Sequence, residues 1–107
     1  MNQISAPELA AWLSDEQRPQ PVLLDVRELS ELQICQIPGS VHMAMHTVPL
    51  RHAELDPQTP IVCICHHGGR SMQVANYLLQ NGFDQIINLT GGVHAWATLV
   101  DTSMARY

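Results

Sequence analysis

The sequence predicts an α/β fold, in which a mostly parallel central sheet of about five strands carries helices on both faces. Short, continuous apolar runs, typical of strands buried on both faces, alternate with segments whose apolar residues recur at helical spacing. Clusters of glycine, proline and polar residues separate these segments. Because the chain has 107 residues, we expect a single domain over residues 1–107, with a tail from about residue 101.

The first half of the chain is expected to begin with a helix. Ser5 has the pattern of an N-cap, Glu8 follows three residues later as in a capping box, and Pro7 is tolerated in the first turn. Apolar residues between positions 9 and 13 give this helix one buried face. The other elements expected in this half are strands over residues 22–26 and 41–43 and helices over residues 28–34 and 47–55, the last with Pro49 in its first turn.

The second half contains the clearest strand of the chain, which covers residues 61–65 and reads Ile-Val-Cys-Ile-Cys. A glycine-containing turn follows at residues 66–69. Apolar residues at helical spacing then predict a helix over residues 70–80, which Asn81 and Gly82 end. The remaining elements are a strand over residues 86–89 and, after Gly91 and Gly92, a last helix that carries Val93, Trp96 and Leu99.

The composition argues against a nucleic-acid-binding or membrane protein. The formal net charge is −5, lysine is absent, and the five arginines form no basic run. No apolar stretch has the length of a bilayer span, and the first residues lack the pattern of a secretory signal, so we expect a cytoplasmic protein. An odd number of cysteines, three, is a poor disulfide framework and predicts free thiols in a reducing compartment.

Cys65 is the candidate nucleophile, because it lies between a predicted strand and a predicted helix. A glycine-rich turn that enters a helix directs several backbone N–H groups into one concavity, and the helix N-terminus adds a partial positive charge. This environment stabilises a thiolate and an anionic adduct on it, and His66, His67 and Arg70 would add positive potential. The alternative is a buried core cysteine at a strand end.

Cys63 and the two histidines leave several interpretations open. Cys63 shares a strand face with Cys65, so it is either a core residue or a resolving thiol or metal ligand. His66 and His67 would position an acceptor, tune the thiolate or bind a metal ion. Because the Cys-x-Cys-His-His run lacks the ligand spacing of structural zinc sites, we predict no metal.

Arg70 has two possible roles. It lines the loop and attracts anions, or it pairs with a carboxylate near the base of the loop, such as Asp25 or Glu28. Asp25 lies inside an apolar run and needs polar partners if it is buried. We expect it to hold backbone amides or Arg70 at the carboxyl edge of the sheet.

Four segments resemble the rhodanese-like domain family and together cover almost the whole chain. Residues 65–71, Cys-His-His-Gly-Gly-Arg-Ser, resemble the active-site loop of that family, which a cysteine opens. Residues 23–28 are similar to its early strand signature. Residues 37–42, Ile-Pro-Gly-Ser-Val-His, are similar to its second turn, and residues 89–92 with Trp96 are similar to its closing motif.

This resemblance implies a sulfurtransferase of the thiosulfate sulfurtransferase type. Cys65 would take a sulfur atom from a small anionic donor such as thiosulfate, or from a protein persulfide, and pass it to a thiol or to cyanide. No metal or organic cofactor is required. The implied donor-binding residues are His66, His67, Gly68, Gly69, Arg70 and Ser71, with a cradle of backbone amides over residues 66–70. Asp25, Arg27 and Glu28 are expected to support the site structurally.

Two other functions are compatible with the same fold. One is a non-catalytic rhodanese-like module that binds a protein partner, which needs neither the cysteine nor the glycines. The other is a thiol-based phosphatase or reductase, but those relatives have a loop one residue longer than the Cys65–Arg70 loop. The chain departs from the family pattern at Cys35-Gln36, where Gly-His is usual. Its loop histidines also replace the two basic side chains typical of enzymes adapted to thiosulfate.

Overall fold

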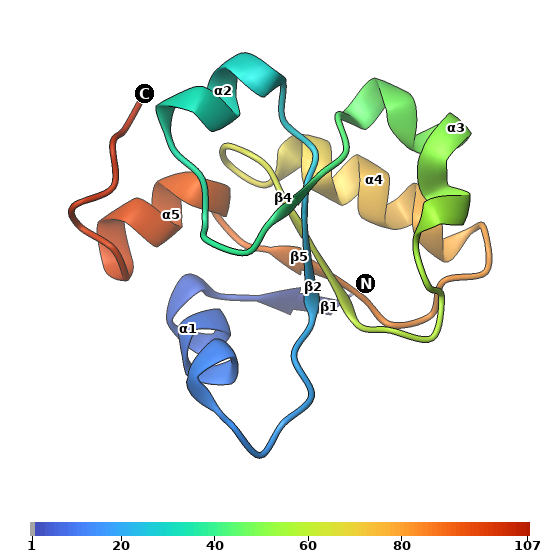
Figure 1. Cartoon of the computed structure of the whole chain (residues 1–107), viewed down its shortest axis with the longest axis horizontal. Helices are drawn as coiled ribbons and strands as arrows, with labels where there is room; N and C mark the ends of the chain where they lie inside the picture. Colours follow the sequence, from blue (N-terminus) through green and yellow to red (C-terminus); the bar gives the residue numbers. More distant parts are fainter. Residues whose placement is uncertain (1) are drawn as a thin grey trace.

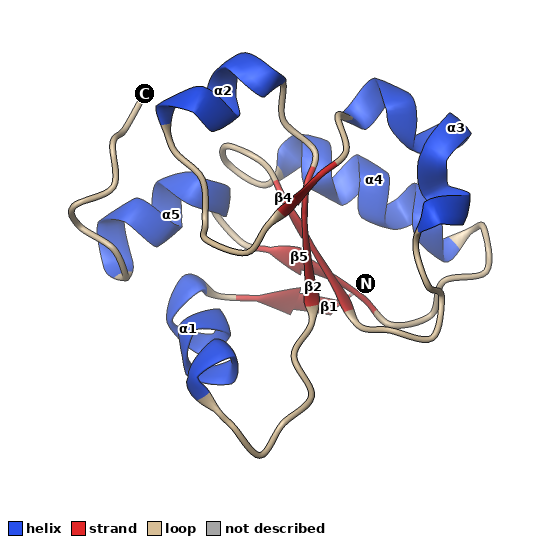
Figure 2. Ribbon diagram, viewed as in Figure 1, coloured by secondary structure: helices blue, strands red, loops and turns tan. Residues whose placement is uncertain are grey.

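The structure of the protein, a computed structural model, describes residues 2–107. A central sheet of five parallel strands, in the order β1-β5-β4-β2-β3, has helices on both faces, as the sequence predicts (Figures 1 and 2). The strands are β1 (Asn2–Ile4), β2 (Val22–Asp25), β3 (Val41–His42), β4 (Ile61–Ile64) and β5 (Ile86–Leu89). The helices are α1 (Ala6–Ser14), α2 (Leu29–Ile34), α3 (Val48–Arg51), α4 (Gly69–Leu79) and α5 (Gly92–Leu99), with 3-10 turns η1 (Met45–Thr47) and η2 (His52–Glu54).

Strand β1 is the element that the sequence pattern does not predict. It has three residues, of which Asn2 and Gln3 are exposed, so it contains no apolar run. It pairs with β5, where Asn2 lies opposite Ile87. The position of this edge strand therefore depends on a partner far along the chain. The capping box at Ser5 follows directly and is confirmed, since the Glu8 N–H donates to Ser5 Oγ over 3.2 Å and the Ser5 N–H donates to Glu8 Oε1 over 3.0 Å.

The single helix expected over residues 47–55 is wrong in detail, because three short elements occupy the region. Pro49 lies in the first turn of α3, where its missing N–H is tolerated. The turn before it is a 3-10 turn, in which the Val48 N–H donates to the Met45 carbonyl. The turn after it, η2, is also 3-10 and ends as the Leu55 N–H donates to the His52 carbonyl. Helix α3 itself therefore has only four residues.

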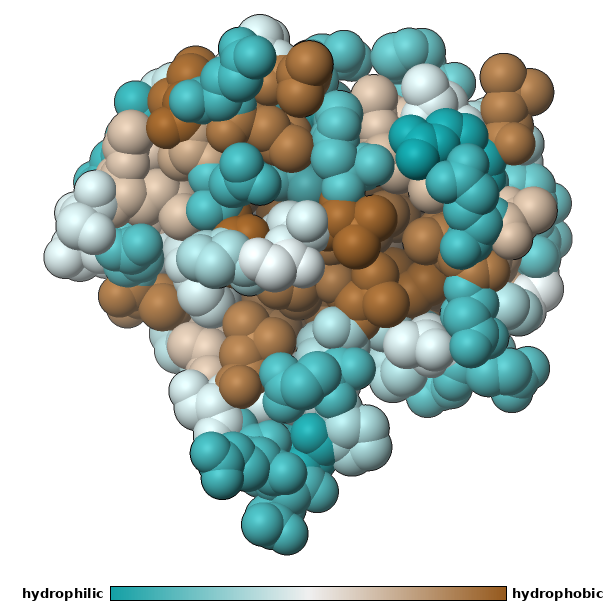
Figure 3. Space-filling model, in the orientation of Figure 1, coloured by the Kyte–Doolittle hydropathy of each residue, from teal (hydrophilic) through white to brown (hydrophobic). Residues whose placement is uncertain are grey.

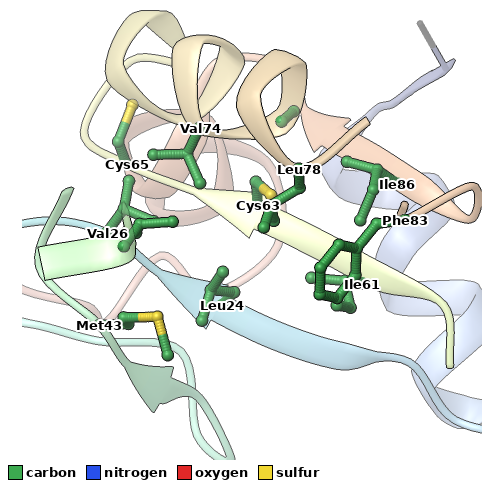
Figure 4. Close-up of a cluster of buried hydrophobic side chains, with 12 residues drawn as sticks. Leu24, Val26, Met43, Ile61, Cys63, Cys65, Val74, Leu78, Phe83 and Ile86 are labelled. Carbon is green, nitrogen blue, oxygen red and sulfur yellow. The ribbon is translucent and has the colours of Figure 1, made fainter. Parts of the chain in front are cut away.

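Two hydrophobic clusters lie on opposite faces of the sheet. Leu24 belongs to one cluster and Leu23 to the other, because successive side chains of a strand point to opposite faces. Helix α4 covers the first cluster, which contains Cys63 and Cys65 (Figure 4), and helices α1 and α5 cover the second. All four residues of β4 are buried. The strand that leads to Cys65 is therefore the centre of the packed core.

A buried ion pair lies at the carboxyl end of β2. The carboxylate of Asp25 and the guanidinium of Arg27 are both fully buried, with Arg27 Nη2 2.7 Å from Asp25 Oδ2 and Nε 3.0 Å from Oδ1. Arg27 also donates to the Cys35 carbonyl over 2.8 Å and to the Tyr107 hydroxyl over 3.0 Å. Burial alone opposes its charge, but these hydrogen bonds hold the pKa of Arg27 above its ordinary value. Asp25 also accepts the backbone N–H of Arg27 over 3.1 Å, so it holds a backbone amide as expected, whereas it does not hold Arg70, because Arg27 occupies both of its oxygens.

The surface next to α3 and α4 is partly apolar. In the space-filling view, apolar side chains gather in the middle of the face turned to the viewer, and polar side chains surround them (Figure 3). Leu50 on α3 is 90% exposed. Single exposed apolar side chains are normal in monomers, so the exposure of Leu50 does not by itself identify a binding surface. Across residues 2–107, no helix has the length and hydropathy needed for a membrane span.

The buried ion pair leads to a prediction about stability. Arg27→Ala leaves the Asp25 carboxylate buried without its partner, so we expect a loss of about 3–5 kcal/mol in the free energy of unfolding, measured by urea denaturation. Arg51→Ala is the control, because its pair with Glu54 is solvent-exposed and its removal should change stability little. Equal small losses in the two variants would show that the Asp25–Arg27 pair has no special structural role.

Candidate active site

Cys65 follows β4 at the carboxyl edge of the sheet, where the loop to α4 begins. Its side chain belongs to the core cluster, and the residue is 1% exposed. The Gly68 N–H donates a hydrogen bond to Sγ over 3.1 Å. Gly68 has a φ of +109°, a conformation that side-chain-bearing residues rarely adopt. The glycine therefore allows the chain to turn back so that its amide meets the sulfur.

Two buried polar side chains, Ser71 and Asn88, complete the surroundings of the sulfur. Ser71 Oγ lies 3.3 Å from Cys65 Sγ, 3.2 Å from the Gly68 carbonyl oxygen and 2.6 Å from Asn88 Oδ1. A hydroxyl has one proton, so Ser71 donates to one of these three acceptors at a time. The Asn88 amide in turn donates to the Gly68 carbonyl over 3.2 Å. Asn88 thus holds both the loop backbone and the hydroxyl that lies next to the sulfur.

Asn88 is absent from the sequence-based candidates. It lies in β5, opposite Cys63 of the neighbouring strand, and is 1% exposed. The available signal was a single amide side chain inside the predicted apolar strand over residues 86–89. A polar group buried there must find a hydrogen-bonding partner, and the adjacent strand carries the candidate nucleophile.

Helix α5 holds the backbone of the loop from the other side. The Val93 N–H donates to the Cys65 carbonyl over 2.9 Å, and the His94 N–H donates to the His66 carbonyl over 3.1 Å. Gly92, with a φ of +57°, allows this close approach, because a Cβ there would overlap both carbonyl groups. The N–H and C=O of a trans peptide point in opposite directions. With these carbonyls bound to α5, the amide N–H groups of His66 and His67 face away from that helix.

Arg70 pairs with Glu31 of α2, which corrects the expected partners Asp25 and Glu28. The pair is bidentate, with both N···O distances 2.8 Å. Hydrogen bonds from Arg70 hold the pKa of Glu31 near 2, and those same bonds raise the pKa of Arg70. Glu28 instead begins α2 as its N-cap residue, and its exposed carboxylate lies 3.7 Å from His46. The geometry therefore shows Arg70 as a link between α4 and α2.

The two loop histidines lie at the surface next to Tyr107. The His66 ring stacks on the Tyr107 ring, with centroids 3.8 Å apart and an interplanar angle of 10°, and lies 3.9 Å from the His67 ring. Burial and the neighbouring His67 lower the pKa of His66. The Tyr107 hydroxyl donates to Glu31 Oε1 over 2.8 Å. The expected tail therefore packs against the loop, a contact for which the sequence contains no signal.

The other two cysteines lie outside the loop. Cys63 is fully buried between the strands and α4 (Figure 4), and burial together with the nearby Cys65 raises the pKa of its thiol to about 12. Its position agrees with the core interpretation rather than with a resolving thiol. The Cys35 thiol is half-buried, and its Sγ lies 3.9 Å from Arg27 Nη1.

These contacts suit a nucleophilic sulfur that carries negative charge. A backbone N–H points at Sγ, a hydroxyl lies within reach of it, and helix α4 begins at Gly69 with its N-terminus towards the loop. A Cβ at Gly69 would meet no other atom within 4 Å, so the first turn of the helix stays open.

Comparisons with known proteins find relatives in both sequence and fold. Residues 5–99 match the family described as the rhodanese-like domain. A protein named sulfurtransferase from Allochromatium vinosum is 34% identical over 97 residues, which cover 91% of this chain and 89% of that protein. The thiosulfate sulfurtransferase GlpE of Tolumonas auensis is 32% identical over 93 residues, 87% of this chain and 85% of that protein. The crystal structure of a rhodanese-like domain protein from Staphylococcus aureus has a TM-score of 0.84 and 31% identity, and covers 100% of this chain and 99% of that chain.

The approach of α5 to the loop can be tested at Gly92. Gly92→Ala combines a positive φ with overlap of the Cys65 and His66 carbonyls, whereas Gly82→Ala has the positive φ alone, with open space around its Cβ. We expect Gly82→Ala to cost about 1–2 kcal/mol of stability, and Gly92→Ala a further ~1–3 kcal/mol. Thermal unfolding of the two variants measures this difference. An equal loss in both would show that α5 can move away from the loop without cost.

The Glu31–Arg70 pair predicts acid sensitivity. The pKa of Glu31 is about 2 in the folded chain and 4.5 ordinarily, so its stabilising contribution is complete above about pH 4.5 and is lost as the pH falls towards 2. Glu31→Gln should therefore be less stable at neutral pH and should lose less stability over that range. Urea denaturation at several pH values measures the effect, with Glu54→Gln as the solvent-exposed control. Parallel pH profiles for wild type and Glu31→Gln would contradict this assignment.

Proposed function

The chain belongs to the rhodanese-like domain family, and from this premise we propose that it is a sulfurtransferase whose Cys65 carries the transferred sulfur as a persulfide. The observation that carries the proposal is the position of Cys65 Sγ, which accepts the Gly68 N–H and lies beside the Ser71 hydroxyl. Both groups stabilise negative charge on sulfur more than they stabilise a neutral thiol.

The reaction has two steps. In the first, the Cys65 thiolate attacks the outer sulfur of the donor, a sulfur–sulfur bond forms, and the leaving group departs with the electron pair of the broken bond. With thiosulfate the leaving group is sulfite, and with a persulfide donor it is a thiolate. In the second step, an acceptor thiolate or cyanide attacks the terminal sulfur, and Cys65 leaves as a thiolate again. Each step exchanges one sulfur–sulfur bond for another bond to sulfur, so no oxidant or reductant is consumed.

Each loop residue has a separate role in this proposal. Gly68 supplies the N–H that binds Sγ, and Ser71 supplies a hydroxyl that turns towards the sulfur when charge develops there. Gly69 and the amides of His66 and His67 form the rest of the cradle that receives the outer sulfur. Arg70 links the start of α4 to α2 through Glu31, while Asp25, Arg27 and Glu28 support the surrounding elements.

The charges around the loop give thiosulfate little advantage over a persulfide as the sulfur donor. Arg70 is engaged by Glu31, and the lowered pKa of His66 leaves that ring mainly neutral at pH 7. A thiosulfate dianion therefore gains little from fixed cations at this site. We propose a small or protein-bound persulfide as the donor in cells and a thiol as the acceptor. A reducing compartment such as the cytoplasm suits this chemistry, because thiols stay reduced there and serve as acceptors.

A mass measurement tests the proposal. Incubation with thiosulfate, or with a small persulfide, should add about 32 Da, the mass of one sulfur atom, to the intact chain, and cyanide should remove it. Cys65→Ser should form no adduct. Cys63→Ser is the matched control, because Cys63 lies on the same strand but is buried, and it should retain the adduct.

The outcome of this experiment separates the competing functions. No adduct from either donor would sink the sulfur-carrier role and would favour a module that only binds a partner. Hydrolysis of a phosphate ester by the wild type, lost in Cys65→Ser, would instead indicate a phosphatase.

A further inference from the structure

Three histidines converge at the surface of the Cys65 loop, although they come from two different elements. His66 and His67 follow Cys65 directly, and His94 belongs to the first turns of α5. One ring nitrogen from each of the three lies within 4.8 Å of the others. The His67 ring is 5.0 Å from the His94 ring, and the His94 N–H donates to the His66 carbonyl. The hydrogen bonds between the loop and α5 thus keep the three side chains together.

The arrangement differs from the Cys-x-Cys-His-His run, for which the spacing led us to predict no metal. The run from Cys63 to His67 has poor ligand spacing, and Cys63 is buried away from the surface. In the folded chain a different set of candidate ligands comes together, because His94 lies next to His66 and His67. The position of the third ligand, His94, thus depends on the packing of α5 on the loop, and the spacing of the Cys-x-Cys-His-His run does not predict it.

The distances suit a small transition-metal ion. Tetrahedral zinc with Zn–N bonds of about 2.0–2.1 Å separates its nitrogen ligands by roughly 3.3 Å. Each nitrogen therefore has to move by about 1 Å at most from the observed cluster. His67 and His94 are exposed and can change rotamer, while His66 is steadied by its stack on Tyr107. Three imidazoles with one open position are the ligand set of catalytic zinc sites.

The charges near the cluster also allow a cation. The carboxylate of Glu31 accepts a hydrogen bond from the hydroxyl of Tyr107, whose ring stacks on His66, and the chain as a whole is acidic, with a formal net charge of −5. Of the nearby arginines, Arg27 and Arg70 are neutralised by Asp25 and Glu31, whereas Arg106, which lines the same surface pocket as His66 and His94, donates to the Ala97 carbonyl over 2.9 Å. Two of the three arginines are therefore compensated by a carboxylate, and the third is held by a backbone carbonyl.

We propose that His66, His67 and His94 form a binding site for a divalent transition-metal ion of the zinc type at the surface of the Cys65 loop. The three imidazoles supply nitrogen ligands, and the fourth position is open to water or to an external anion. Since two of the ligands belong to the loop that receives the outer sulfur, an ion bound there slows persulfide formation on Cys65. The effect of the ion on persulfide formation rests on the proposed sulfurtransferase function, whereas the binding site itself does not.

The binding site is tested with Zn²⁺ on the full chain, prepared without a histidine tag and in a Cys65→Ser background. Calorimetric titration should show one ion per chain. Loss of an outer-shell partner alone costs about 10–100-fold in metal affinity, so loss of a ligand in His94→Ala should weaken binding by at least about tenfold. His46→Ala is the matched control, because His46 is an exposed histidine outside the cluster, and it should bind zinc like the parent. No saturable binding, or equal affinities in the parent and His94→Ala, would refute the site.

Cobalt spectroscopy and sulfur loading provide two further readouts. Co²⁺ bound by the three imidazoles should give visible absorption bands without a thiolate-to-metal charge-transfer band, and such a band would overturn the histidine assignment. In the chain with Cys65 intact, Zn²⁺ should slow the gain of the sulfur adduct, and His94→Ala should remove this effect. If wild type never forms the adduct, the proposed function fails while the zinc titration still decides the site. If the adduct forms at the same rate with zinc bound, the inhibitory effect is refuted.

Discussion

The candidate site depends on hydrogen bonds made by the carbonyl groups of the Cys65 loop. Helix α5 binds the carbonyls of Cys65 and His66, and Asn88 of β5 binds that of Gly68. A loop that has to direct several N–H groups to one side must place its carbonyls on the other side, because the two groups of each peptide are opposed. Those carbonyls need partners when buried. Elements far along the chain therefore fix the loop in a conformation that leaves its N–H groups free to bind a ligand.

A second network fixes the elements around the loop. The Asp25–Arg27 pair closes β2, Arg27 reaches the Cys35 carbonyl and the Tyr107 hydroxyl, and that hydroxyl continues to Glu31, the partner of Arg70. Helix α2, the start of α4 and the chain segment at Tyr107 are thereby linked to one sheet edge. Most of these partners are ionic and wholly or partly buried, so removing one of them leaves a charge without compensation. Such a network favours one arrangement of the loops over others.

Local patterns in the sequence predict the elements next to the site, but they do not predict the partners across it. The run of apolar residues in β4, the glycines after Cys65 and the Ser5 capping box are local signals, and each corresponds to the observed structure. Asn88 and His94 act through contacts between elements, so their neighbours depend on the strand order and on the packing of α5. The same holds for Glu31, which the sequence alone does not distinguish from Glu28 as the partner of Arg70. Strand β1 shows most clearly what local patterns do not predict, since a short polar segment becomes a strand only through pairing with β5.

If Cys65 carries sulfur as proposed, the burial of Cys63 affects how long that sulfur atom stays on the protein. An inner thiol on the same strand face would ordinarily attack a neighbouring persulfide and expel the sulfur as the chain closes a disulfide. A thiol whose pKa is about 12 remains protonated at physiological pH, and a protonated thiol is a poor nucleophile. Under the proposed function, the core would therefore keep Cys63 from attacking a persulfide on Cys65, and an external acceptor would have to remove the sulfur.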